Sequence, residues 1–260
     1  MKRALIALAL VLAVALAARA QAQTNAGVVR PDDENQLTDL QLGAQLYAGN
    51  CATCHGIAGE GANGKRGSGN VIGRGPSLRG VGARTAHFYL STGYMPLESP
   101  TQQPWRRRVL FTRRELRALV KYVASLGGGP PIPRPAPEHG HLAEGLRLFT
   151  QHCAGCHQVV GEGGYVTDAR VPKLKQATPT QIAEAVRIGP YLMPKFSTKA
   201  ISDRQLNSII AYIEASKKPQ DRGGWGIGHI GPVPEGMVAW FIAAALLIGL
   251  CAVIGERART

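Results

Sequence analysis

The feature that most constrains this chain is a short cysteine–histidine motif that occurs twice. Residues 51–56 read CATCHG, and residues 153–158 read CAGCHQ. In both stretches two residues separate the cysteines, and a histidine directly follows the second cysteine. The surroundings repeat as well, because a glycine, a leucine and an aromatic residue precede each motif at the same distances. These residues are Gly43, Leu46 and Tyr47 in the first copy and Gly145, Leu148 and Phe149 in the second. The chain therefore contains two copies of one structural unit.

Each copy is expected to end in an amphipathic helix that begins at a capping box. Residues 112–115 (TRRE) and 202–205 (SDRQ) have the pattern in which the first and fourth side chains cap each other's backbone N–H groups. Apolar residues then recur at helical spacing in both copies. We expect the helix before each cysteine pair to cross the closing helix, because glycine permits a close approach of two backbones. The residues assigned to the crossings are Gly43, Tyr47, Tyr122, Gly145, Phe149 and Tyr212.

These patterns predict an all-α fold with two similar domains in tandem. No alternating run of apolar and polar residues is long enough to indicate a sheet. The first domain is expected at residues 37–128 and the second at residues 139–218. Residues 129–138 contain the stretch PPIPRPAPE, which is typical of a semi-rigid linker.

The first 22 residues have the layout of an export segment. A basic start, Met1-Lys2-Arg3, precedes an unbroken apolar run over residues 4–18 and small residues suited to cleavage. This layout is typical of a secretory signal peptide, and a retained N-terminal membrane anchor is the alternative. Either would place the body of the chain outside the cytoplasm.

A second apolar segment lies near the C-terminus. Residues 237–255 contain no charged side chain, and as a helix they would span about 28 Å, close to the thickness of a hydrocarbon core. A Gly/Pro-rich arm at residues 219–236 precedes this segment, and the tail at residues 256–260 carries two arginines. The positive-inside rule places that tail in the cytoplasm. We therefore predict a transmembrane helix that anchors the two domains on the outer face of the cell membrane, with a buried core helix as the alternative.

The formal net charge of the chain is +13. Such an excess favours an anionic partner, such as the surface of a lipid bilayer or an acidic protein, although basic flanks and general solubility explain it equally well. Export of the chain argues against nucleic acid as that partner.

Three chemistries use a pair of cysteines at this spacing. A zinc site needs a fourth ligand, for which neither copy has an obvious candidate, and a thioredoxin-type dithiol needs a βαβ setting that the sequence lacks. Cys-x-x-Cys-His is also the attachment signature of c-type haem, in which two thiols one helical turn apart add across the two haem vinyl groups and the histidine ligates iron. We therefore predict two covalently bound haem c groups, one in each domain. The attachment residues would be Cys51, Cys54, Cys153 and Cys156, with His55 and His157 as axial ligands of iron.

Methionine is predicted to supply the second axial ligand. Of the four methionines, one starts the chain and one opens the C-terminal apolar segment. The other two, Met95 and Met193, each precede a proline at matching places in the two copies; packing in a core is the alternative role. His/Met ligation fills both axial positions and raises the reduction potential. This favours one-electron transfer with no catalytic residue in the chain itself, and it argues against a haem peroxidase or gas sensor, which needs an open axial position.

The loop after each motif contains a proline with a predicted role. The backbone carbonyls of Pro76 and Pro172 are expected to accept a hydrogen bond from the outer ring nitrogens of His55 and His157, which would fix the ring orientation. The alternative is that these prolines only shape the loop.

An insertion after Met95 has no counterpart in the second copy. It contains Trp105 followed by Arg106, Arg107 and Arg108. The three arginines are candidates for docking a protein or a lipid surface, and a solvated loop is the alternative.

The order of the motifs resembles that of class I cytochrome c domains: an aromatic helix, Cys-x-x-Cys-His, Pro-x-Leu, Met-Pro and a closing helix. From about residue 37 to its end, the chain is similar to the dihaem cytochrome c subunits of the actinobacterial cytochrome bc1 complex, a menaquinol–cytochrome c reductase. The stretches that carry this resemblance are GPSLRGVG (75–82), STGYMP (91–96), GGGP (127–130), MPKFS (193–197) and, as the most specific, GGWGIGHIGPVPEGM (223–237).

The resemblance implies a role in an aerobic respiratory chain. It implies cytochrome b and a Rieske iron–sulfur protein as partner subunits, the Rieske centre as electron donor and an aa3-type cytochrome c oxidase as acceptor. The alternative is a cytochrome subunit of another complex, such as a cbb3-type oxidase or a periplasmic dehydrogenase. The C-terminal anchor and its Gly/Pro-rich arm favour the first reading.

Overall fold

The computed structural model describes residues 27–61, 75–99, 101–217 and 232–258. The chain divides into two units, Met1–Ser216 and Lys217–Thr260. The first unit contains both copies of the repeat, which we call the first half (up to residue 128) and the second half (from residue 129). The predicted export segment and most of the predicted Gly/Pro-rich arm lie outside the described residues.

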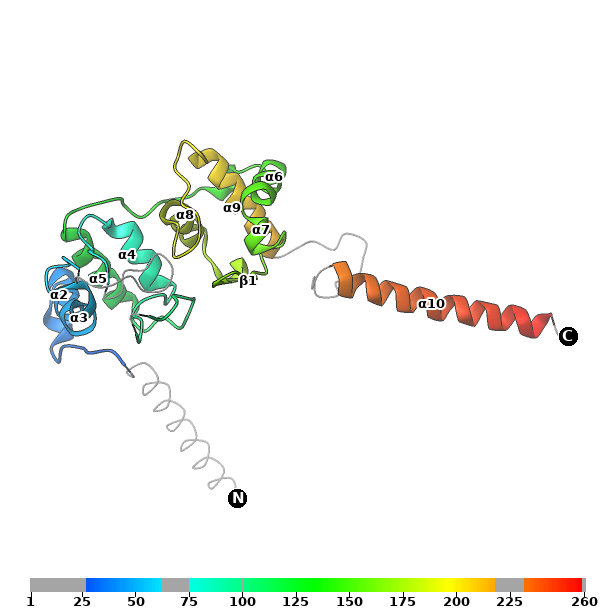
Figure 1. Ribbon diagram of the computed structural model, residues 1–260, viewed down its shortest axis with the longest axis horizontal. Coiled ribbons are helices and arrows are strands. Elements are labelled where there is room, and N and C mark those ends of the chain that lie inside the picture. The colour runs from blue at the N-terminus through cyan, green and yellow to red at the C-terminus, as the bar shows by residue number, and fades with distance from the viewer. Residues whose placement is uncertain (1–26, 62–74, 100, 218–231, 259–260) are drawn as a thin grey trace, which may run out of the picture. The chain divides into compact units, whose positions relative to one another are not determined.

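The described part of the chain is mostly helical, as the sequence predicts (Figure 1). The elements of the first half are η1 (Glu34–Gln36), α2 (Asp39–Asn50), α3 (Ala52–His55), α4 (Gly82–Ser91) and α5 (Arg113–Ser125). Those of the second half are η2 (Pro137–His139), α6 (Leu142–His152), α7 (Ala154–His157), β1 (Gly164–Val166), β2 (Ala169–Val171), η3 (Leu174–Gln176), α8 (Pro179–Ile188) and α9 (Asp203–Lys217).

The predicted crossing of the first and last helices is present in both halves. A Cβ atom at Gly43 would overlap the carbonyl oxygen of Ala118 in α5, and one at Gly145 would overlap that of Ser208 in α9. An aromatic pair lies beside each crossing, with ring centroids 5.1 Å apart for Tyr47 and Tyr122 and 5.4 Å apart for the equivalent pair, Phe149 and Tyr212. Glycine is required at both crossings because the backbones leave no room for a side chain.

Both predicted capping boxes are confirmed. The Thr112 hydroxyl accepts a hydrogen bond from the backbone N–H of Glu115 at 3.3 Å, and the Glu115 carboxylate accepts one from the Thr112 N–H at 2.6 Å. In the second half the Ser202 N–H donates to the Gln205 side chain at 2.9 Å, and the Gln205 N–H donates to the Ser202 hydroxyl at 3.2 Å. Each closing helix therefore starts with its first N–H groups satisfied.

Each half buries a separate apolar core. In the first half the core is formed mainly by α2 and α5, and in the second half by α6, α8 and α9. The fully buried members include Leu42, Leu46 and Leu119 in the first core and Phe149, Ile209 and Ile210 in the second. Two separate cores are what two copies of one small domain should produce.

The second half also contains a small antiparallel hairpin that the sequence did not predict. Strands β1 and β2 pair Gly164 with Val171 and Val166 with Ala169. Each strand has three residues, which is too short for an alternating pattern to be recognised in the sequence.

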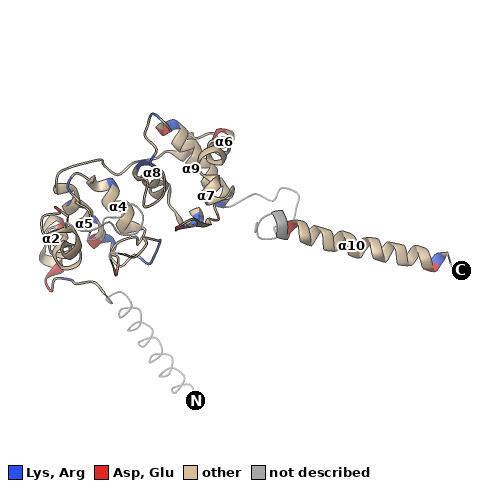
Figure 2. Ribbon diagram, viewed as in Figure 1, with Lys and Arg blue, Asp and Glu red and all other residues tan. Residues whose placement is uncertain are grey.

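The second unit contains helix α10 (Pro232–Arg257). The helix begins five residues before the predicted segment, because Pro232 and Pro234 fall in its first turn, where a missing N–H costs no intrahelical bond. An 18-residue window within Glu235–Arg257 has a mean hydropathy of 2.7, and this stretch is long and apolar enough to cross a membrane. Figure 2 shows its basic residue at the C-terminal end.

Candidate functional site

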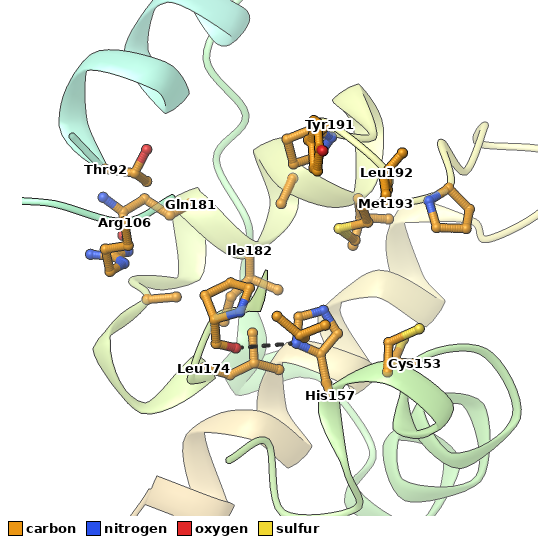
Figure 3. Close-up of a pocket in the computed structure, with 18 of the residues that line it drawn as sticks. Thr92, Arg106, Cys153, His157, Leu174, Gln181, Ile182, Tyr191, Leu192 and Met193 are labelled. Atoms are coloured by element: carbon orange, nitrogen blue, oxygen red, sulfur yellow. Dashed lines mark hydrogen bonds between the residues drawn. The ribbon is translucent and has the colours of Figure 1, made fainter. Parts of the chain in front are cut away.

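One cavity in the second half brings together the residues that the sequence singled out. Cys153, Cys156, His157 and Met193 all line it (Figure 3). Most of the remaining wall is apolar, and α8, α9 and the segment around Leu174 contribute to it. This combination of two thiols, an imidazole and a thioether around an apolar slot fits a covalently attached haem with His/Met ligation.

The cysteine pair is positioned by a one-turn helix. Helix α6 ends at His152, and α7 (Ala154–His157) begins directly after Cys153. The backbone N–H of His157 donates to the Cys153 carbonyl at 2.9 Å, so the two cysteines lie one helical turn apart. The first half repeats this geometry, with the His55 N–H donating to the Cys51 carbonyl at 2.9 Å.

Both histidines of the motifs are oriented by a proline carbonyl. The Nδ1 atom of His55 lies 2.8 Å from the Pro76 oxygen, and that of His157 lies 3.3 Å from the Pro172 oxygen (Figure 3). Burial lowers the pKa of both imidazoles, and the carbonyl contact opposes that effect. A neutral imidazole that donates from Nδ1 keeps the lone pair of Nε2 available for a metal ion.

Burial also sets the protonation of the first cysteine in each motif. It raises the pKa of Cys51 to about 12 and that of Cys153 to about 11, and the neighbouring cysteine of each pair adds to the shift. Redox dithiols and metal-binding thiolates have the opposite property, a lowered pKa. The raised pKa values of Cys51 and Cys153 therefore argue against a redox dithiol, and they suit sulfur atoms that stay uncharged, as in a thioether.

The predicted methionine ligands lie in equivalent surroundings. Met95 packs against the core of the first half together with Cys51, and Met193 packs against the core of the second half together with Cys153. Each half thus brings its methionine and its first cysteine to the same apolar cluster. His87 on α4 is another potential iron ligand near Met95 in the sequence, but its Nδ1 lies 2.7 Å from Glu184 Oε1 on α8.

A tyrosine hydroxyl holds the loop after each motif, but it comes from different helices. In the first half the Tyr47 hydroxyl on α2 donates to the Gly56 carbonyl at 2.7 Å. In the second half Phe149 occupies the place of Tyr47, and the Tyr212 hydroxyl on α9 donates to the Val159 carbonyl at 2.8 Å instead. Tyr47 and Tyr212, assigned only to helix crossings from the sequence, therefore also fix the loops beside the cysteines.

The cavity of the second half is completed by side chains of the first half, which the sequence analysis did not anticipate. Phe88, Tyr94 and Arg106 line it, and Tyr94 directly precedes Met95. The two halves touch here along α4 and α8, where the Gln181 side chain donates to the Ser91 carbonyl at 3.1 Å. The insertion that the second copy lacks was the only sequence signal of this contact.

The insertion itself lies between the halves. Trp105 is stacked between two guanidinium groups, with Arg107 at 5.1 Å and Arg170 of β2 at 5.0 Å from its ring centroid. The Arg106 guanidinium donates to Gln181 Oε1 at 2.6 Å. Arg107 also pairs with Glu98 at 3.4 Å, so Arg106 and Arg107 are both engaged within the chain. Docking of a partner by Arg106, Arg107 and Arg108 stays a prediction.

Two family profiles match the chain, one in each half. A profile described as cytochrome c matches residues 40–127, and a profile described as cytochrome C oxidase, cbb3-type, subunit III matches residues 140–213. The chain thus contains two cytochrome c domains, and its fold class is confirmed.

Relatives of known name match most of the chain. The cytochrome bc1 complex cytochrome c subunit of Mycobacterium tuberculosis is 35% identical over 235 residues, which cover 86% of this chain and 80% of that protein. The subunit of the same name from Corynebacterium diphtheriae is 33% identical over 243 residues, which cover 86% of this chain and 83% of that protein. The cbb3-type cytochrome c oxidase subunit CcoP of Azospirillum is 26% identical over 205 residues, which cover 70% and 64% of the two chains.

Proposed function

This chain belongs to the family of cytochrome bc1 complex cytochrome c subunits, and from that premise we propose that it passes single electrons from the Rieske centre of a quinol–cytochrome c reductase towards an aa3-type terminal oxidase. The chain carries two covalently bound haem c groups, one in each cytochrome c domain. Haem iron, when bound, supplies a one-electron couple. The protein alone is then an electron carrier, and its enzymatic activity is that of the complex to which it contributes.

The residues assigned to haem attachment are those of the two motifs. Cys51 and Cys54 would form thioethers in the first domain, and Cys153 and Cys156 would form them in the second. His55 with Met95, and His157 with Met193, would ligate the two irons. The observation that carries this assignment is the cavity of the second domain, where both cysteines, the histidine and the methionine line one apolar slot.

The surrounding residues would favour electron transfer at the two sites over binding or conversion of a substrate. The Pro76 and Pro172 carbonyls hold the imidazoles in one orientation. The apolar walls would limit access of water, and Met95 and Met193, as iron ligands, would occupy the position that a substrate would otherwise need. Both effects favour a raised reduction potential and simple electron exchange.

We propose that α10 anchors the chain in the cell membrane with the haem domains on the outer face. The helix has no charged side chain between Glu235 and Glu256 and ends at Arg257, and a second arginine, Arg259, follows in the sequence. The positive-inside rule then puts that end in the cytoplasm. A reporter active only in the cytoplasm should work when fused after Thr260, and activity of an export-dependent reporter at that position would reverse the orientation.

Purification in mild detergent tests the partner assignment. We expect cytochrome b, a Rieske protein and an aa3-type oxidase to co-purify with the full chain. The alternative, a subunit of a cbb3-type oxidase or a periplasmic dehydrogenase, is favoured by one observation, the match of the second domain to the cbb3 subunit III profile. Co-purification with a cbb3-type oxidase or a dehydrogenase, in the absence of cytochrome b, would establish that alternative.

A further inference from the structure

The attachment residues fix which way round a haem lies in the cavity of the second domain. The vinyl groups that form thioethers and the two propionate carboxylates are on opposite edges of the haem macrocycle. A haem bound through Cys153 and Cys156 must therefore direct its carboxylates to the end of the cavity that is farthest from these cysteines. That end is where anion-binding groups should be sought.

Figure 3 shows Arg106 at that far end. Cys153 lies at one side of the cavity, His157 and Met193 lie between, and Arg106, Gln181 and Thr92 lie at the other side. Arg106 belongs to the insertion of the first domain, so this end of the second cavity is built across the contact between the two domains.

Arg106 is a half-buried cation with a neutral partner. Its guanidinium donates to Gln181 Oε1 at 2.6 Å, and no carboxylate among the described residues lies within ion-pair distance of it. Burial lowers the pKa of Arg106, the direction expected for a cation that lacks a counter-charge. Of the other cations that line the cavity, Lys173 pairs with Glu162 at 2.8 Å, and Arg170 stacks on Trp105.

Gln181 keeps Arg106 in place. Its side-chain oxygen also accepts the backbone N–H of Thr178 at 3.1 Å, as part of the capping box of α8, and its nitrogen donates to the Ser91 carbonyl at 3.1 Å. Gln181 is almost fully buried. The guanidinium is therefore held at the N-terminus of α8, and its other N–H groups make no hydrogen bond to the described residues. They can meet a planar anion, which arginine binds through two parallel hydrogen bonds.

We propose that the Arg106 guanidinium, supplied by the first domain, binds a propionate carboxylate of the haem held by the second domain. Arg106 is a positioning residue in this account: it completes the haem site and joins the two domains through the cofactor. The inference rests on the proposed attachment of haem at Cys153 and Cys156.

The charge of Arg106 should tune the potential of one haem only. A cation near the haem stabilises the ferrous form, which has one positive charge less than the ferric form. Arg106→Gln should therefore lower the potential of the second haem by about 59 mV, a roughly tenfold change in the equilibrium between its oxidised and reduced forms. The potential of the first haem should stay unchanged.

Two control variants separate charge from position. Arg106→Lys keeps the charge and should have most of the wild-type potential of the second haem. Arg107→Gln makes the same charge change in the same loop, at a residue that does not line the cavity, and should leave both potentials unchanged.

The experiment uses the full chain with both haems, purified in detergent. Covalent haem is counted first in the wild type and in every variant. Two haems in each protein confirm the attachment sites independently of the role of Arg106, whereas a wild type with fewer than two covalent haems would contradict the attachment sites. A spectroelectrochemical titration then gives the two potentials, and resonance Raman spectra give the propionate bending bands. A lowered second potential with a shifted propionate band in Arg106→Gln, against unchanged values in Arg107→Gln, supports the proposal. Three results would overturn the proposal. They are unchanged potentials in Arg106→Gln, an equal lowering of the second potential in Arg107→Gln or Arg106→Lys, and a lowered second potential in Arg106→Gln with an unshifted propionate band.

Discussion

The two halves of the chain share one framework but differ in the segment between the methionine and the closing helix. In the second half Met193 is followed closely by the capping box at Ser202, whereas the first half inserts the loop that carries Trp105 and Arg106 before Thr112. That loop, together with Tyr94, forms a wall of the second cavity. The extra residues of one copy thus line the site of the other, so the halves share a fold but contribute differently to the two sites.

Two smaller differences lie inside the shared framework. The hydroxyl that holds the loop after the motif comes from Tyr47 on the first helix in one half and from Tyr212 on the last helix in the other. The closing helix of the first half is capped by a buried carboxylate, Glu115, which also bonds Arg30, whereas the second half has a neutral Gln205 at that position. Each difference gives a way to alter one half and leave the other as a reference.

The largest expected effect is loss of one haem when a cysteine pair is removed. Cys153→Ala with Cys156→Ala should halve the covalent haem content, and Cys51→Ala with Cys54→Ala should do the same. The remaining haem should respond unequally. Loss of the first haem frees Met95 and its neighbour Tyr94, which lines the second cavity, so the second haem should shift in potential, whereas the first haem should keep its potential when the second is lost.

Haem is measured on the polypeptide after acid–organic extraction, and the potential of the remaining haem is measured by redox titration. Cys251→Ala is the matched control, because Cys251 belongs to α10 and not to an attachment motif, and its loss should leave two haems. A full haem content in either double variant would refute the attachment sites. If the potential of the remaining haem shifted equally in the two double variants, the predicted one-way dependence of the second haem site on the first half would be refuted.

The Glu115 carboxylate at the N-terminus of α5 should make the stability of the first half more sensitive to acid than that of the second half. Burial opposes ionisation of Glu115, but the hydrogen bonds from Arg30 and Thr112 outweigh it and lower the pKa of Glu115 below the ordinary value of 4.5. A lowered folded-state pKa gives stability that is present above the unfolded-state pKa and is lost as the pH falls through the folded-state pKa. Glu115→Gln should cost roughly 1–3 kcal/mol at neutral pH, because Arg30 loses its partner, and the cost should shrink on acidification below about pH 4.

Urea unfolding at a series of pH values, followed by the absorbance of each haem, measures this difference. Gln205→Glu is the matched control, because it places a carboxylate at the equivalent cap, where no arginine of the described residues bonds the side chain. It should change stability by less than about 1 kcal/mol. A cost of Glu115→Gln that stays constant between neutral and acidic pH would show that the carboxylate of Glu115 is not the acid-sensitive group.

The smallest expected effect concerns the tyrosine hydroxyls. Tyr47→Phe should speed amide hydrogen exchange in residues 56–61 about three- to tenfold, because it removes one hydrogen bond worth roughly 0.5–1.5 kcal/mol. Tyr212→Phe should do the same in residues 158–163 and leave the first loop unchanged. Tyr122→Phe is the control, because its hydroxyl makes no hydrogen bond within the described residues, and neither loop should respond. Faster exchange in both loops in any one variant would mean that the two loops are not stabilised independently by Tyr47 and Tyr212.

Local rules in the sequence predicted the framework well. The capping boxes at Thr112 and Ser202 and the glycines at the helix crossings depend on residues close in sequence or on a repeated spacing, and both were found. The hairpin at residues 164–171 was missed because three-residue strands have no readable period. The positions of Phe88, Tyr94 and Arg106 in the second cavity were also missed, because they depend on how the two halves pack, and a pattern within one repeat holds no information about that contact. The roles of the cysteines, histidines and methionines in binding haem stay predictions that only chemistry can test.

A spectroscopic redox titration of the wild type, Met95→His and Met193→His tests directly whether the two methionines ligate haem iron. A thioether favours ferrous iron more than an imidazole does, so each substitution should lower the potential of its own haem, on the order of 0.1 V, and leave that of the other nearly unmoved. All three proteins should keep two covalent haems, because the cysteines and the histidines of the motifs are intact. If either substitution leaves both potentials in place, that methionine is not an iron ligand, and the account of two His/Met haem sites fails for that half.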